Sequence, residues 1–191
     1  MGKFDLLSAR GVSRRDFMKL IAASTAALGL PEVLAPQAAN AVEKALKKPP
    51  VIWLEGMDCA GCTESTLATL NPSAAEVVLD MISIRYHETI MAGAGQVAEE
   101  SYKETLKEKF ILVVEGSIPS KEDRYCMVGG RAFRETVLEA SKAAEAIIAV
   151  GSCATDGAGI PGACDVDAVG VRELLTLNGI DKPVINLPSC Q

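Results

Sequence analysis

Short, almost unbroken runs of apolar residues recur along the chain and alternate with segments of helical periodicity. Five such runs predict strands, at Val51–Leu54, Glu76–Ile84, Phe110–Val114, Ala146–Val150 and Pro183–Leu187. Continuous apolar runs, rather than alternating ones, are typical of parallel strands that are covered on both faces. We therefore expect a mostly parallel sheet.

The segments between these runs complete the pattern. Four of them predict helices, at Thr63–Leu70, about Gln96–Lys107, Gly130–Ala143 and Val166–Leu177, and the polar stretch Glu115–Met127 predicts a loop. Strands and helices in alternation predict an α/β fold, a doubly wound parallel sheet with helices on both faces and right-handed crossovers.

The first 41 residues have the organisation of an export signal. A basic segment, Ser13–Lys19, precedes the uncharged run Leu20–Leu30 and the small residues Ala39–Ala41. That order is typical of a secretory signal, and the paired arginines followed by Asp16 and Phe17 resemble a twin-arginine signal. A basic amphipathic surface helix is the alternative. We predict that residues 1–41 are removed on export to the periplasm, which leaves one domain, 42–191, that contacts a membrane only through partners.

Charge and histidine content exclude some classes of function. The chain of 191 residues carries 19 Lys and Arg against 25 Asp and Glu, a net charge of −6. This argues against nucleic acid as a partner, because phosphate binding relies on basic surfaces. A single histidine, His87, makes a histidine-rich metal site or a Ser-His-Asp triad improbable. The chemistry is therefore expected in the six cysteines.

Four cysteines follow predicted strands. Cys59 and Cys62 follow the first strand in a C-x-x-C pattern, Cys153 follows the fourth, and Cys190 follows the fifth. Ligands of such sheets bind beyond the carboxyl ends of the strands, so these thiols should lie at one edge. Four cysteine thiolates are the usual ligands of an iron–sulfur cluster. The twin-arginine route, used by proteins that fold around cofactors before export, favours a metal site over disulfides.

Two other sites would use the same residues. A C-x-x-C pattern that opens a helix also describes a thiol–disulfide oxidoreductase, which would need only Cys59 and Cys62. A structural zinc ion would also accept four thiolates, although zinc ligands usually come as two close pairs. Cys126 and Cys164 fall in predicted loops, where we expect reduced thiols or, less favoured, a disulfide between them.

Several segments, in order and spacing, resemble the small subunit of nickel–iron hydrogenases. They are Val51–Gly56 leading to Asp58–Ser65, then Tyr86–Ala92, Val113–Pro119 and Gly151–Thr155. The resemblance implies a flavodoxin-like domain that holds the proximal 4Fe–4S cluster through Cys59, Cys62, Cys153 and Cys190. It also implies a heterodimer with a large subunit that contains the nickel–iron centre and cleaves dihydrogen. This chain would then have no catalytic residue and would pass electrons to an acceptor such as a cytochrome.

The chain departs from that family in three places. Gly61 and Ala158 stand where oxygen-tolerant members have additional cysteines, which implies the oxygen-sensitive type, and the region Asp156–Asp165 differs from the family pattern. Family members continue past the fourth ligand into a second cluster-binding domain, whereas this sequence stops at Gln191. A truncated remnant is thus a further alternative, and we expect weak cluster binding by the chain alone.

Three further residues can be interpreted from their positions in or next to the predicted strands. We expect His87 to be a structural hydrogen-bonding group rather than a proton relay, and Trp53 to lie in the core. Glu115 ends the third predicted strand, at the edge that carries the cysteines. It could lie near the cluster or a partner, or be a solvated carboxylate, and the sequence leaves both interpretations open.

Overall fold

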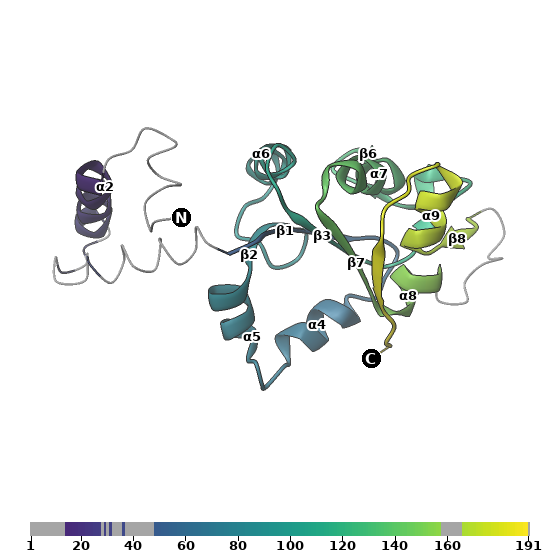
Figure 1. Cartoon of the computed structure of the whole chain (residues 1–191), viewed down its shortest axis with the longest axis horizontal. Helices are drawn as coiled ribbons and strands as arrows, with labels where there is room; N and C mark the ends of the chain where they lie inside the picture. Colours follow the sequence, from purple (N-terminus) through teal and green to yellow (C-terminus); the bar gives the residue numbers. More distant parts are fainter. Residues whose placement is uncertain are drawn as a thin grey trace. The chain divides into compact units, whose positions relative to one another are not determined.

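The computed structural model describes residues 14–27, 29, 31, 36, 48–157 and 166–190. The chain divides into two compact units, Met1–Lys48 and Pro49–Gln191. In the first unit, helix α2 spans Arg14–Ala27, from the paired arginines into the apolar run (Figure 1). The predicted cleavage site at Ala39–Ala41 lies outside the described residues. Among the helices described, none has the length and apolar character needed to cross a membrane.

The second unit is built on a sheet of five parallel strands. They are β1 (Pro50–Glu55), β2 (Ser83–His87), β3 (Ile111–Glu115), β7 (Ala146–Val150) and β9 (Val184–Leu187). Their order across the sheet is β2-β1-β3-β7-β9, and every pair is parallel. This is the flavodoxin-like doubly wound order, whose switch point lies between β1 and β3. The predicted fold class is confirmed.

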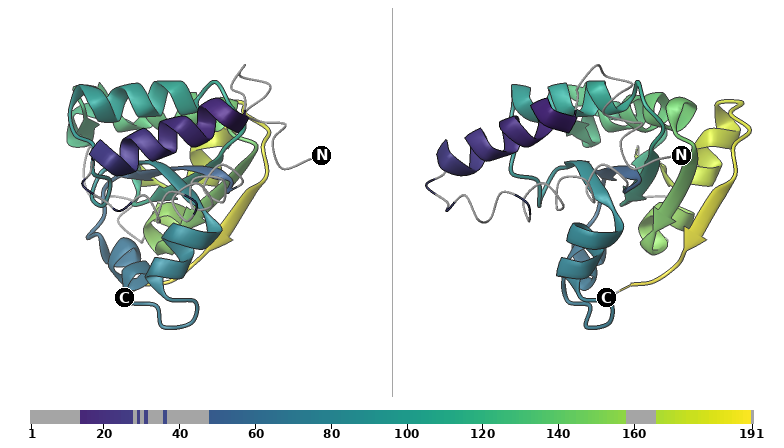
Figure 2. Two further views of the ribbon diagram at one scale, coloured as in Figure 1. Left: turned by 90° about the vertical axis from the view of Figure 1, so that its left-hand side faces the viewer. Right: turned by 60° about the vertical axis from the view of Figure 1, so that its left-hand side comes forward.

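Three helices cover one face of the sheet. They are α6 (Gln96–Thr105), α7 (Phe133–Ala143) and α9 (Val171–Leu177), and they lie together on the upper side in Figure 1 and Figure 2. The main hydrophobic core lies beneath them, where side chains such as Leu54, Leu112 and Ile147 are almost fully buried. This face therefore supplies most of the apolar burial that stabilises the unit.

The opposite face is covered unevenly. Helix α4 (Gly61–Leu67), helix α5 (Ala74–Glu76) and the π-helical turn η2 (Val77–Met81) lie on this side, as does α8 (Gly151–Asp156) (Figure 1). Side chains of α4 and η2 enclose a small apolar pocket against β1 and β2. On β9, by contrast, Ile185 is 54% exposed and Leu187 is 50% exposed. The predicted helices on both faces are present, but within the described part of the chain they leave these two β9 side chains half exposed.

The second predicted strand is wrong over most of its length. Residues Glu76–Met81 are helical, and strand β2 begins only at Ser83. The reason is local: Ser73 and Glu76 form a reciprocal capping box, in which each side chain accepts a hydrogen bond from the other's backbone N–H. A capping box starts a helix, so the apolar residues that follow pack as a helical turn.

Smaller differences concern element ends. Helix α7 begins at Phe133 because a hairpin of β5 (Met127–Val128) and β6 (Arg131–Ala132) precedes it, and α9 begins at Val171. The predicted loop Glu115–Met127 contains the short strand β4 (Ile118–Pro119), which pairs with β8 (Ala168–Val169), and the 3-10 turn η3 (Asp123–Tyr125).

Two isoleucines on adjacent strands test the uneven cover. Ile147 is 1% exposed and Ile185 is 54% exposed. We expect Ile147→Ala to lower the free energy of unfolding by about 2–5 kcal/mol, because it leaves a cavity in the core. Ile185→Ala should cost less than about 1 kcal/mol. Urea unfolding of both variants measures the difference, and equal losses would show that another surface covers Ile185 in solution.

Candidate functional site

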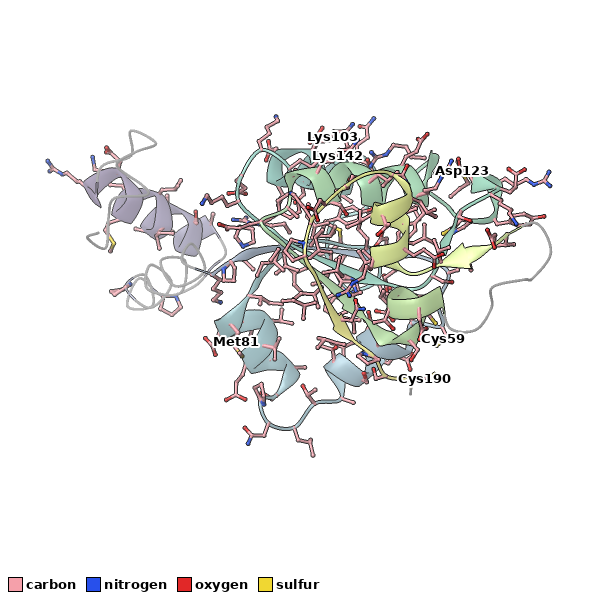
Figure 3. The ribbon with its side chains drawn as sticks, turned by 45° about the vertical axis from the view of Figure 1, so that its right-hand side comes forward. Cys59, Met81, Lys103, Asp123, Lys142 and Cys190 are labelled. Carbon is pink, nitrogen blue, oxygen red and sulfur yellow. The ribbon has the colours of Figure 1, made fainter. Side chains whose placement is uncertain are left out.

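The four candidate cysteines lie at one edge of the sheet. Cys59 and Cys62 follow β1, Cys153 lies in α8 directly after β7, and Cys190 follows β9. All strands of this sheet are parallel, so their carboxyl ends meet at the same edge, and Figure 3 shows Cys59 and Cys190 at the same end of the sheet. All four are free thiols, Cys59 and Cys190 exposed and the other two half-buried. The predicted convergence is therefore present.

The pKa shifts of the thiols also reflect their proximity to one another. Burial raises the pKa of Cys62 to about 11, and the charges of Glu115, Cys153 and Cys59 add to the increase. The pKa of Cys153 is raised by burial first and then by Cys59 and Cys190. Each of these two thiols therefore senses the charge of other cysteines in the group, as expected for side chains that lie close together.

Backbone geometry brings the segments close. The N–H of Ser152 donates to the carbonyl oxygen of Ser189, 2.8 Å away, which ties the start of α8 to the Cys190 segment. Gly151 has φ +83°, and a Cβ atom there would collide with Sγ of Cys62. Gly151 therefore lets the thiol of Cys62 lie directly against the backbone that carries Cys153.

The four thiols offer the donor set of a metal centre. Four cysteine thiolates are the usual ligands of an iron–sulfur cluster, and a structural zinc ion accepts the same four. Both kinds of centre would use the free thiols that the structure brings to this edge of the sheet.

Glu115 is a central polar group of the site. It ends β3 and is fully buried, so its interpretation as a solvated carboxylate is wrong. Its Oε1 accepts hydrogen bonds from the backbone N–H groups of Cys62 and Thr63, at 3.0 and 3.2 Å. Its Oε2 accepts from Thr63 Oγ1 at 2.6 Å and from Trp53 Nε1 at 3.2 Å. Glu115 thus lies against the cysteine turn.

His87 and Trp53 support this group. His87 is 1% exposed, and its ring stacks on Trp53 with 5.2 Å between centroids. Nδ1 of His87 accepts from the N–H of Thr89, and Nε2 lies 3.4 Å from Thr63 Oγ1. Burial is the main cause that lowers the pKa of His87, which favours the neutral ring. His87 is a structural hydrogen-bonding group, as predicted, and Trp53 lies in the core but also donates a hydrogen bond that the sequence did not predict.

Sequence reasoning missed the other acidic groups around the cysteines. Glu55 is buried and lies in register with Glu115 on the neighbouring strand. Burial raises the pKa of Asp58 to about 6 and that of Glu88 to about 8. Glu88 accepts a hydrogen bond from the N–H of Glu55 at 3.1 Å. The sequence did contain a signal for them: the first and third predicted strands are both followed by the dipeptide Glu-Gly, which begins at Glu55 and at Glu115.

Cys126 is not part of the group of four. Cys126 is a half-buried free thiol that packs against the main core, and burial raises its pKa to about 11. It is therefore the reduced thiol that was expected. Cys164, its suggested disulfide partner, lies outside the described residues, as does Ala158.

Comparisons with known proteins agree with the resemblance. The family model described as "NADH ubiquinone oxidoreductase, 20 Kd subunit" matches residues 59–191. The Hydrogenase-2 small chain of Escherichia coli K12 is 41% identical over 99% of this chain and 51% of its own length. The uptake hydrogenase small subunit of Azotobacter vinelandii is 39% identical over 98% of this chain and 52% of its own length. The chain thus spans about half the length of these relatives.

Solved structures lead to the same family. The recombinant [NiFeSe] hydrogenase from Desulfovibrio vulgaris Hildenborough is similar with a TM-score of 0.70 and 39% identity, over 75% of this chain and 54% of that one. A [NiFeSe] hydrogenase from Dm. baculatum gives a TM-score of 0.70 and 36% identity, over 75% of this chain and 57% of that one.

Proposed function

Since the chain belongs to the family of the 20 kDa subunit of NADH ubiquinone oxidoreductase, and is similar over almost its whole length to hydrogenase small subunits, we propose that it is the electron-transfer subunit of a nickel–iron uptake hydrogenase. One observation carries the proposal: three parallel strands deliver four free thiols to one edge of the sheet. A constellation drawn from distant parts of the sequence suits a shared cofactor, whereas Cys59 and Cys62 alone would suffice for dithiol chemistry.

Cys59, Cys62, Cys153 and Cys190 would hold a proximal 4Fe–4S cluster, which supplies one-electron transfer when bound. The chain's own residues would shield the cluster from water and set its reduction potential. The apolar side chains behind the edge exclude water, and the buried carboxylate of Glu115 contributes charge beside Cys62. Burial, hydrogen bonds and nearby charge are the means by which a protein sets a cluster's potential.

The partner would be a hydrogenase large subunit that contains the nickel–iron centre. An electron-transfer subunit must present its cofactor to the site that releases electrons, so the edge with Cys59 and Cys190, both exposed, is the surface that we assign to this contact. Electrons would then leave toward an acceptor such as a cytochrome. The chain spans about half the length of these relatives, and we include in the proposal that further segments, on the same or another polypeptide, carry the electrons onward.

We further propose export by the twin-arginine route, with residues 1–41 as the signal and the periplasm as the destination. The order of the basic, apolar and small-residue segments supports this. Cysteines that already hold a cluster on export would be protected from oxidation.

Iron and acid-labile sulfide analysis tests the function. The chain is co-expressed anaerobically with a cognate large subunit, and the complex is purified without oxygen. We expect about four sulfides per small chain, and about four irons beyond those of the large subunit. Stoichiometric zinc, or four titratable thiols with no cluster iron, would contradict the proposal.

A further inference from the structure

The helix that carries Cys62 begins without a cap of its own. Helix α4 starts at Gly61, and the preceding residue, Ala60, has a left-handed backbone conformation and no side chain that can accept a hydrogen bond. The first N–H groups of a helix have no acceptor within the helix and need one from elsewhere. Glu115, at the end of strand β3, supplies this acceptor: its Oε1 accepts hydrogen bonds from the N–H groups of both Cys62 and Thr63.

The second oxygen of Glu115 is equally engaged. Oε2 accepts from Thr63 Oγ1 and from Trp53 Nε1. The carboxylate therefore has four donors around it, although its side chain is fully buried. A buried charge is tolerated when it is hydrogen-bonded in this way, and hydrogen bonds to charged groups are among the stronger ones. The four donors thus hold the Glu115 carboxyl group in one orientation beside the cysteine turn.

The distances around the Thr63 hydroxyl indicate where its proton goes. Nε2 of His87 lies 3.4 Å from Thr63 Oγ1, while Nδ1 of the same ring lies near both the N–H of Thr89 and Glu55 Oε2, at 3.2 and 3.4 Å. Glu115 Oε2 lies 2.6 Å from Thr63 Oγ1, against 3.3 Å for Glu55 Oε1, so the proton is directed to Glu115.

We propose that Glu115 is a positioning residue for the cluster that the proposed function assigns to this edge. It caps α4 from a neighbouring strand, fixes the backbone that carries Cys62, and keeps a negative charge beside that ligand. The negative charge opposes the addition of an electron to the cluster. The N–H groups of Cys62 and Thr63, held by the carboxylate, are also less available to stabilise the reduced cluster's sulfur atoms.

The variant Glu115→Gln, in the complex with the large subunit, tests this proposal. Glutamine keeps the shape, and its carbonyl oxygen can still accept from Cys62 and Thr63, but the charge is lost. We expect the cluster to be retained and its reduction potential, followed by spectroscopic redox titration, to shift to a more positive value. Glu64→Gln is the matched control: it removes the same charge from an exposed position of the same helix, where solvent screens it, and should shift the potential much less.

A potential in Glu115→Gln that equals that of Glu64→Gln would overturn the proposal. If Glu115→Gln does not retain the cluster, the double variant Trp53→Phe/Glu115→Gln removes the indole N–H that would face the glutamine NH₂ group. Recovery of the cluster with a more positive potential would then support the proposal, and no recovery would count against it. A wild-type complex without a cluster would instead contradict the proposed function.

Discussion

Cys153→Ser should leave the complex with the large subunit without its small-subunit cluster, and the iron that belongs to this chain should fall from about four to near zero. The thiolate of Cys153 is one of four proposed ligands, and a serine hydroxyl is a much weaker ligand because on its own it does not ionise near neutral pH. Anaerobic iron and sulfide analysis, together with the visible absorption of the cluster, measures the loss.

Cys126→Ser is the matched control for this variant. Cys126 is also a half-buried free thiol with a raised pKa, but it packs against the main core and does not follow a strand of the five-stranded sheet. We expect it to retain about four irons. Full iron content in Cys153→Ser would remove Cys153 from the ligand set. A wild-type complex without iron, whose Cys59 and Cys62 show dithiol reactivity that Cys153→Ser leaves unchanged, would instead favour a thiol oxidoreductase.

The strands were predictable where burial alone determines them. Four of the five apolar runs became strands with ends within a residue or two, because a strand covered by packing needs little else to specify it. The run around Val77–Leu79 failed for the opposite reason. A capping box at Ser73 and Glu76 starts a helix immediately before it, and this local hydrogen-bond pattern overrides the apolar composition. The signal was in the sequence, three residues upstream.

The cysteine positions were also predictable, since the carboxyl ends of parallel strands meet at one edge. The support around them was not. The hydrogen bonds of Glu115 to Cys62 and Thr63 join residues more than fifty positions apart and depend on the register between β1 and β3. Helix α8, which carries Cys153, is only six residues long and has no periodicity to reveal it. Such features follow from tertiary packing and leave no local pattern in the sequence.

Gly151→Ala should lower the cluster content of the complex several-fold, although the change adds a single methyl group. The backbone at Gly151 has φ +83°, which L-residues adopt at a cost of about 1–2 kcal/mol. More important, the new Cβ atom would collide with Sγ of Cys62. The thiol must move, and one of the four sulfurs then leaves the place where the cluster needs it.

Gly179→Ala separates these two effects. Gly179 also has a positive φ, +65°, but a Cβ atom there would meet nothing within 4 Å. This variant should therefore lose about 1–2 kcal/mol of stability and keep its iron and sulfide. If both variants lose the cluster alike, backbone strain and not the collision is responsible. If Gly151→Ala keeps a full cluster, the sulfur of Cys62 binds from a different direction than the one it has here, and Gly151 is then important only for the turn after β7.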